Sequence, residues 1–162
     1  MVLSKKTKII ILCVLLVLTL AFIWGNSLLP ASESEKLSDT VKEVLEQVLP
    51  EDFFQGDGSD DSNLIRKLAH FTEFTLLGME LTLLLWEILQ YSVTTPLLAG
   101  LLAAVTDETI QIFIEGRGSS VRDVWIDFGG VALGTLLIFI LRRFQNRRRR
   151  RPHAAYQQRH KA

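Results

Sequence analysis

Two short runs of ionisable and amide residues interrupt stretches that are otherwise apolar enough to cross a membrane. The first run contains Lys67, His70 and Glu73, and the second contains Glu108 and Gln111. Ionisable side chains inside membrane spans are costly, rare and usually functional. A histidine one helical turn from a carboxylate is a candidate pair for general acid–base catalysis. The candidate catalytic residues are therefore His70 and Glu73, with Glu108 as a further carboxylate.

Arg117, Asp123 and Asp127 follow these runs and complete the candidate site. Arg117 carries a planar guanidinium, which suits a phosphate or a carboxylate. Asp123, a further catalytic candidate, and Asp127 share one helix face with Gly130 and Gly134. A Gly-x-x-x-Gly pair on such a face allows close helix approach, and we expect this packing to occur within the chain.

The predicted ligand-binding set comprises Lys67, His70, Glu108, Gln111, Arg117, Asp123 and Asp127. A divalent cation held by His70, Glu73, Glu108, Asp123 and Asp127 is chemically allowed, because hard cations prefer oxygen donors. The sequence contains no H-E-x-x-H motif, nucleophile motif, Gly-rich phosphate loop or Cys/His zinc signature. We therefore expect no metal and no cofactor. The polar residues could equally serve as packing contacts between helices.

The elements that must position these residues are predicted to be membrane helices. Hydrophobic residues make up 48% of the 162, and they cluster. We expect an all-α, multi-pass protein of the cell membrane, with transmembrane helices at about 9–29, 66–90, 95–114 and 121–141. This domain, 1–141, includes an external loop, 30–65, and is followed by a basic cytoplasmic tail, 142–162, predicted to be poorly structured.

The external loop is predicted to hold a short amphipathic helix on the membrane surface or at the end of the bundle. Apolar residues recur at helical spacing over 32–49, where Ser32 and Glu35 could form a capping box. The helix should end at Pro50. Residues 51–63 are expected to form an acidic linker, because their composition offers no core.

The third predicted span should begin with Thr95 as N-cap and Pro96 as the first helical residue. On this helix Gly100, Ala104, Asp107 and Gln111 share a face that should point inward. The turn at 115–120 contains two glycines, which allow positive φ, and two serines, which can cap the next helix.

The first apolar run fits either a retained membrane anchor or a cleaved signal peptide. The small-residue site that ends at Ala31 has Leu29 two positions earlier, which is a poor cleavage pattern, so we favour the retained anchor. Cys13 is the only cysteine, so no disulfide can form within the chain.

Charge is distributed unevenly along the sequence. Three lysines precede the first span, nine basic residues occupy 142–161, and 33–61 holds ten acids and two lysines. Positive flanks favour the cytoplasm, so four spans place both ends inside and the candidate site near the outer leaflet. The glutamates at 73, 80 and 87 form one stripe on the second span. Glu80 and Glu87 could serve a proton path or equally face a partner helix or the inner headgroups, and for Glu87 we favour the headgroups.

A spaced set of residues resembles the VanZ-like family of small bacterial membrane proteins over about residues 9–141. The set comprises Lys67-x-x-His70-Phe71, Asp107-Glu108-x-x-Gln111, Arg117, Asp123, Asp127 and Gly130-x-x-x-Gly134, with Trp24, Ser27, Pro30, Ser34 and Ser38 around the end of the first span. This chain departs from the family pattern at Asp127, where Asn is usual, at Phe74, where Tyr is common, and at Glu115, where Pro often stands.

The resemblance implies a four-helix envelope protein, some of whose relatives are associated with resistance to teicoplanin-like glycopeptides. One hypothesis is a non-enzymatic protein whose outward-facing polar site lowers sensitivity to such antibiotics. The alternative is a membrane-embedded enzyme acting on a lipid-linked headgroup of the cell envelope. A third reading gives the polar residues a structural role only. The expected partners are membrane lipids, a lipid-linked cell-wall precursor or a glycopeptide, and not nucleic acid.

Overall fold

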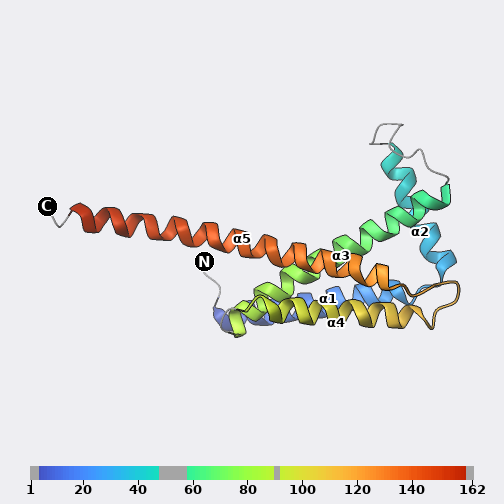
Figure 1. Cartoon of the computed structure of the whole chain (residues 1–162), viewed down its shortest axis with the longest axis horizontal. Helices are drawn as coiled ribbons and strands as arrows, with labels where there is room; N and C mark the ends of the chain where they lie inside the picture. The colour runs from blue at the N-terminus through green and yellow to red at the C-terminus, as the bar shows by residue number, and fades with distance from the viewer. Residues whose placement is uncertain (1–3, 48–57, 90–91, 160–162) are drawn as a thin grey trace.

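The computed structural model describes residues 4–47, 58–89 and 92–159, and this part of the chain is all-helical. Its elements are α1 (Lys5–Ser27), α2 (Ala31–Glu46), α3 (Gly58–Ile88), α4 (Thr94–Gln111) and α5 (Val121–Arg159). Figure 1 shows that α1 and α4 run in one direction while α3 and α5 run in the other, so the start of α1 and the distal half of α5 extend toward the same end.

Three of the described helices are long and apolar enough to cross a membrane. They are α1, residues Asn63–Ile88 of α3 and residues Val121–Asn146 of α5. Helix α4, the third of the predicted spans, is not among them, because acidic and amide side chains occupy part of its 18 residues. Three of the four predicted segments thus form helices that are long and apolar enough to span a membrane.

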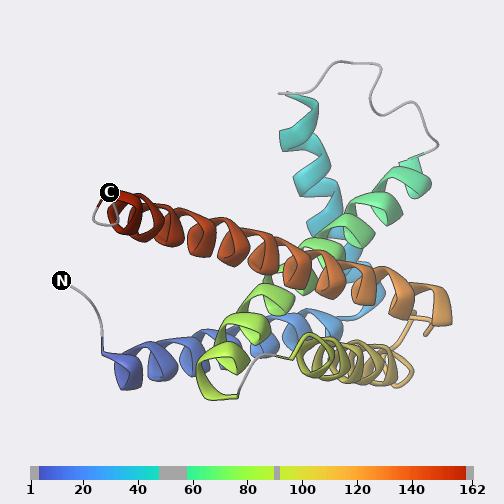
Figure 2. The ribbon, with the colours of Figure 1, turned by 60° about the vertical axis from the view of Figure 1, so that its left-hand side comes forward.

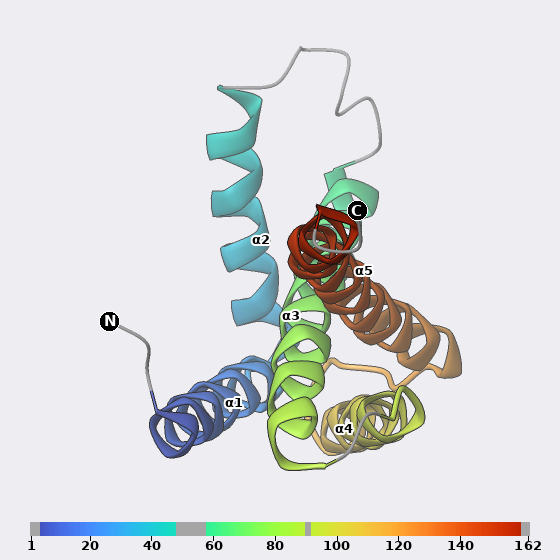
Figure 3. The same ribbon diagram turned by 90° about the vertical axis from the view of Figure 1, so that its left-hand side faces the viewer.

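Helix α3 occupies the centre of the bundle and contacts each of the other helices, most extensively α5. The end-on view in Figure 3 shows α1, α4 and α5 arranged around it. Glycines allow the backbones of α3 and α5 to touch. A Cβ at Gly130 would meet the Phe71 carbonyl oxygen, and one at Gly134 would meet the Thr75 carbonyl oxygen. The predicted close approach at these glycines is therefore intramolecular.

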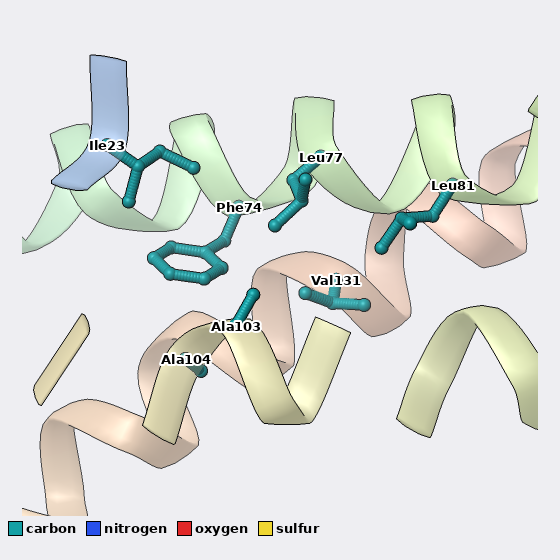
Figure 4. Packing of buried hydrophobic residues seen from close by; sticks show 7 residues of the cluster. All are labelled: Ile23, Phe74, Leu77, Leu81, Ala103, Ala104 and Val131. Carbon is teal, nitrogen blue, oxygen red and sulfur yellow. The ribbon is translucent and has the colours of Figure 1, made fainter. Parts of the chain in front are cut away.

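A small apolar core lies where the four long helices meet. Its side chains, shown in Figure 4, are Ile23, Phe74, Leu77, Leu81, Ala103, Ala104 and Val131. Phe74 and Leu77 are fully buried. On α4, Gly100, Ala104, Asp107 and Gln111 are all buried, which confirms the predicted inward face. The same face thus joins an apolar core to a polar end.

Helix α1 is held to α3 by two polar contacts that the sequence did not predict. Thr19 Oγ1 donates to Glu80 Oε1 at 3.0 Å, and Asn26 Nδ2 donates to Glu73 Oε1 at 3.2 Å. The donors and the acceptors are each spaced by seven residues, as two antiparallel helices in steady contact require. These partners stabilise the two carboxylates in the bundle.

The third glutamate of the stripe faces a different helix. Glu87 Oε1 lies 3.3 Å from Arg142 Nη2 of α5, and the Arg142 guanidinium lies 5.0 Å from the centre of the Trp86 ring. The stripe on α3 is therefore divided between α1 and α5, because the crossing of the helices changes which neighbour it meets.

Helix α2 projects from the bundle beside the start of α3 (Figure 2). Ser34 and Ser38 are buried, whereas Leu37, Val41 and Val44 are exposed. The predicted amphipathic helix is present, and its apolar residues face outward, where a membrane surface can cover them. Its predicted end at Pro50 lies outside the described residues.

Three helix starts differ from the prediction. Helix α2 begins at Ala31, with Pro30 O accepting from the amides of Glu33 and Ser34, so Ser32 is not its N-cap. Residues 58–63 of the predicted linker belong to α3 instead, and acids near a helix N-terminus favour such an extension. Helix α4 begins at Thr94, with Val93 as N-cap in place of Thr95.

Two helix ends differ as well. Helix α4 ends at Gln111 rather than at about 114. Helix α5 continues through Arg159, so the prediction of a poorly structured tail is wrong for 142–159. Arginine, glutamine and alanine are good helix formers, and a helix that is already nucleated in the apolar part of α5 can propagate through them.

Candidate functional site

A polar cavity of about 60 Å³ lies where α3, α4, α5 and the turn between α4 and α5 meet. All seven residues of the predicted ligand-binding set line it. The complete lining is Arg66, Lys67, His70, Glu108, Gln111, Gly116, Arg117, Gly118, Asp123, Ile126 and Asp127. Residues spread over about sixty positions of sequence thus converge because the helices are antiparallel neighbours.

The turn that closes the cavity is fixed by backbone geometry and one carboxylate. Gly116 has φ +74°, the positive value that glycine tolerates, whereas Gly118 does not need one. The Ser120 amide donates to Glu108 Oε2 at 2.8 Å, and Ser120 Oγ accepts from the Arg122 amide at 3.1 Å. The predicted serine cap is confirmed, and Glu108 ties α4 to the start of α5.

Arg117 reaches across the bundle to the end of α1. Its Nη2 donates to the Asn26 carbonyl oxygen at 2.9 Å, while its buried Nε has no hydrogen-bond partner among the described residues. Burial lowers the pKa of Arg117, and the positive charge of Arg66 acts in the same direction. An arginine remains charged in proteins despite such a shift. Arg117 therefore offers a cation that lines the cavity and is only partly compensated.

His70 is paired with Asp107, and not with Glu73 as the sequence suggested. The His70 Nδ1 and Asp107 Oδ2 atoms are 3.8 Å apart, and the Asp107 side chain is fully buried. Glu73 is one turn away on the same helix, but its Oε1 turns to Asn26 of α1. The candidate acid–base pair thus joins two helices instead of two turns of one.

Gln111 positions the Asp107 carboxylate. Its Nε2 donates to Asp107 Oδ2 at 2.9 Å and reaches Ser27 Oγ of α1 at 3.3 Å. Ser27, at the end of α1, and Gln111, at the end of α4, therefore lie at the same level of the bundle. Ser27 and Asp107 were absent from the predicted binding set, although their inward spacing was a usable signal for Asp107.

One group of potential metal ligands lies beside the cavity, among the residues described. His70, Asp107 and Asp127 each place a donor atom within 4.8 Å of the others. The other three carboxylates of the set that the sequence allowed for a metal bind elsewhere, Glu73 to Asn26, Glu108 to the Ser120 amide and Asp123 to Lys67 at 3.9 Å. The fold thus brings together a smaller set than the sequence suggested, and it adds Asp107.

Several buried polar atoms around the cavity have no hydrogen-bond partner within the described parts of the chain. They are His70 Nδ1, Asp107 Oδ1, Arg117 Nε and Asp123 Oδ1. Leaving one such atom unsatisfied costs about 1–3 kcal/mol, and buried polar atoms in proteins are almost always paired. This concentration of unmet donors and acceptors indicates a place for water, an ion or a polar ligand.

An apolar groove of about 250 Å³ lies on the other side of α4, between α1, α3 and α4. It is lined by Leu20, Trp24, Leu77, Leu81, Ala99, Leu102, Ala103 and Thr106. Trp24 and Thr106 lie one turn or less from Ser27 and Asp107, so the groove reaches the level of the polar contact. Its composition suits hydrocarbon.

Residues 9–142 match the family described as VanZ/LLP1. No curated protein matches the chain, and no solved structure does.

Proposed function

Because the chain belongs to the VanZ/LLP1 family, we propose that it is a bacterial envelope protein that lowers sensitivity to teicoplanin-like glycopeptide antibiotics through an outward-facing polar site. The observation that carries the proposal is the cavity at the junction of α3, α4 and α5. Arg66, Lys67 and Arg117 line it together with His70 and buried polar atoms that lack partners. Such a cavity suits an anionic group presented at a membrane surface.

The proposed topology has four membrane passes with both ends in the cytoplasm. Helix α4 has 18 residues, so its length is about 27 Å, close to the roughly 30 Å of a bilayer core. Its polar end then lies at the outer interface. The lysines before α1 and the arginines late in α5 satisfy the positive-inside rule.

Cysteine labelling tests this topology. In a Cys13→Ser background, Gly118→Cys should react with a membrane-impermeant maleimide added to intact cells, whereas Gln145→Cys should react only after permeabilisation. Protection of the cysteine at 118 together with labelling at 145 would reverse the orientation and remove the outward-facing site.

The size of the cavity restricts the ligand. Drug-sized molecules occupy pockets of about 300–1,000 Å³, and this cavity has about 60 Å³. It can admit a phosphate-sized group but not the body of a glycopeptide. We therefore assign the site to the anionic headgroup of a membrane lipid or a lipid-linked cell-wall precursor, and the effect on the antibiotic follows from holding that lipid.

Paired arginine variants test the function. Arg117→Ala removes a cation that lines the cavity, and Arg122→Ala removes a nearby cation whose side chain is exposed. In a susceptible bacterial host that expresses each variant at equal membrane levels, the minimal inhibitory concentration of teicoplanin should fall to the empty-vector value for Arg117→Ala and stay at the wild-type value for Arg122→Ala. Wild-type protection by Arg117→Ala would contradict the proposal.

A second candidate function is catalysis on a lipid-linked headgroup, and the pairing of His70 with Asp107 favours it. A histidine beside a buried carboxylate can exchange a proton with a bound group, while Arg117 stabilises negative oxygen atoms. Purified protein should then convert a labelled cell-wall lipid, and His70→Gln should abolish turnover while Arg122→Ala keeps it. An absence of turnover over a panel of such lipids would leave the binding role.

A further inference from the structure

We propose that His70, Asp107 and Asp127 bind one divalent transition-metal cation of the Zn²⁺ or Mn²⁺ class beside the polar cavity. The sequence predicted no metal, since it contains no dense ligand motif. The three ligands come instead from three helices, and only the fold brings them together. The inference goes beyond the proposed function, because metal binding can be measured on the purified protein without any antibiotic.

The distances among the donor atoms fit one ion. The three atoms lie within 4.8 Å of one another, and His70 Nδ1 lies 3.8 Å from Asp107 Oδ2. The latter separation is too long for a hydrogen bond. Two ligands at about 2.1 Å from the same cation lie up to about 4.2 Å apart. Small side-chain rotations therefore suffice to close the three ligands on a cation.

The charge around these residues also requires compensation. Asp107 is 0% exposed and Asp127 is 2% exposed, so both carboxylates are removed from water. Within the described residues, no lysine or arginine nitrogen forms an ion pair with either carboxylate, since Lys67 pairs with Asp123 and Arg117 donates to a carbonyl. Buried carboxylates that ionise need a partner or a metal. A divalent cation would balance both negative charges and leave the imidazole neutral.

Buried polar atoms without hydrogen-bond partners are an independent indication that a ligand binds between these three residues. Asp107 Oδ1 belongs to a fully buried side chain and has no hydrogen-bond partner among the described residues, and His70 Nδ1, at 3.8 Å from Asp107 Oδ2, has none either. Gln111 meanwhile binds the other carboxylate oxygen, Oδ2, and holds the group in orientation. Hydrogen bonds of this kind commonly position metal ligands and tune their affinity.

The donor set and the adjoining space indicate the class of metal and its role. One imidazole and two carboxylates suit Zn²⁺ or Mn²⁺ better than Ca²⁺ or Mg²⁺, which prefer oxygen donors alone. His70 and Asp127 also line the cavity of about 60 Å³. A metal with three protein ligands would keep an open position toward this cavity, where water or a phosphate oxygen could bind.

Metal binding by the full-length protein in detergent tests the proposal. The purified chain is stripped with a chelator and then titrated with ZnCl₂ and, separately, with MnCl₂. Isothermal titration calorimetry should give one site per chain for at least one of the two cations. Asp127→Asn, which keeps the size of the side chain, should weaken that binding at least about a hundredfold. Glu115→Gln removes an exposed carboxylate from the turn between α4 and α5, outside the cavity lining, and should change the affinity only a few fold.

Cobalt supplies a spectroscopic readout that reports the ligands of the bound ion. Co²⁺ bound to the stripped wild-type protein should show visible absorption bands, and His70→Gln should shift or abolish them while a circular dichroism spectrum confirms that the variant is helical. No binding of either cation, or equal affinities of Asp127→Asn and Glu115→Gln, would overturn the metal site. If Arg117→Ala loses antibiotic protection but still binds the metal, both proposals are supported, and the two effects are shown to depend on different residues.

Discussion

The contact between α3 and α5 predicts different stability effects for alanine substitutions at two adjacent glycines of α5. An alanine Cβ at Gly130 would meet the Phe71 carbonyl oxygen, as well as the Thr75 nitrogen at 3.1 Å. At Gly129 the nearest atom would be Phe71 Cε2 at 3.5 Å, an ordinary contact with a side chain. Gly130→Ala should therefore destabilise the protein, whereas Gly129→Ala should not.

The expected magnitude follows from two opposing terms. Each replacement gains helix propensity of up to about 1 kcal/mol, because glycine is a poor helix former. Overpacking at Gly130 costs about 1–3 kcal/mol, and the upper part of this range applies where the obstructing atoms belong to the backbone and cannot rotate away. The propensity term cancels in the comparison. Gly130→Ala should thus be less stable than Gly129→Ala by about 1–3 kcal/mol.

Equilibrium unfolding in mixed micelles, with helical circular dichroism as the signal, measures this difference. The pair forms its own control, since the two residues are neighbours on one helix and undergo the same chemical change. A difference below about 0.5 kcal/mol, the usual scatter for neutral surface changes, would show that the helix backbones are not in contact at Gly130. That result would also mean that the backbone contact between α3 and α5 does not hold Asp127 close to His70 of α3.

Two further predictions concern single polar contacts between helices. Asn26→Ala removes the donor to Glu73 and should lower the unfolding free energy by about 1–3 kcal/mol. Cys13→Ala, at an exposed position on the same helix, should change the unfolding free energy by less than about 0.5 kcal/mol. Equal effects of the two variants would contradict the contact between Asn26 and Glu73. Arg142→Ala removes an ion pair and a ring contact with α3 and should lower the melting temperature in detergent. Arg143→Ala, which removes the same charge from an exposed position, should not, and identical melting temperatures would refute the role of Arg142.

Much of the site could be predicted because helical periodicity and charge placement act locally. The seven residues of the predicted binding set line one cavity, since antiparallel neighbours joined by short turns return to the same end of a bundle. The buried face of α4 and the glycine face of α5 followed from spacing alone. Positions on a helix face are encoded within a few turns, so the sequence specifies them well.

Pairing between helices could not be read in the same way. His70 has a carboxylate one turn away, yet it meets Asp107, because the rotation of α3 directs Glu73 toward Asn26. Such a choice depends on how several helices cross, and no local pattern encodes it. Thr19 and Asn26 of α1 were missed for the same reason, since they are ordinary polar residues until their partners are known. Ser27 belonged to the family-like pattern, but its contact with Gln111 was not predicted.

The C-terminal end of α1 contributes polar contacts to the folded bundle, in addition to any role of this helix in membrane targeting. Its Ser27 hydroxyl meets Gln111, its Asn26 carbonyl receives Arg117, and the Ala31 amide just beyond it donates to the Glu115 carbonyl oxygen at 3.3 Å. Proteolytic release after insertion would strip the first two of these contacts from the mature protein. An unrelated hydrophobic helix grafted in its place could restore biogenesis but would deprive Gln111 of the Ser27 hydroxyl and Glu73 of its Asn26 donor.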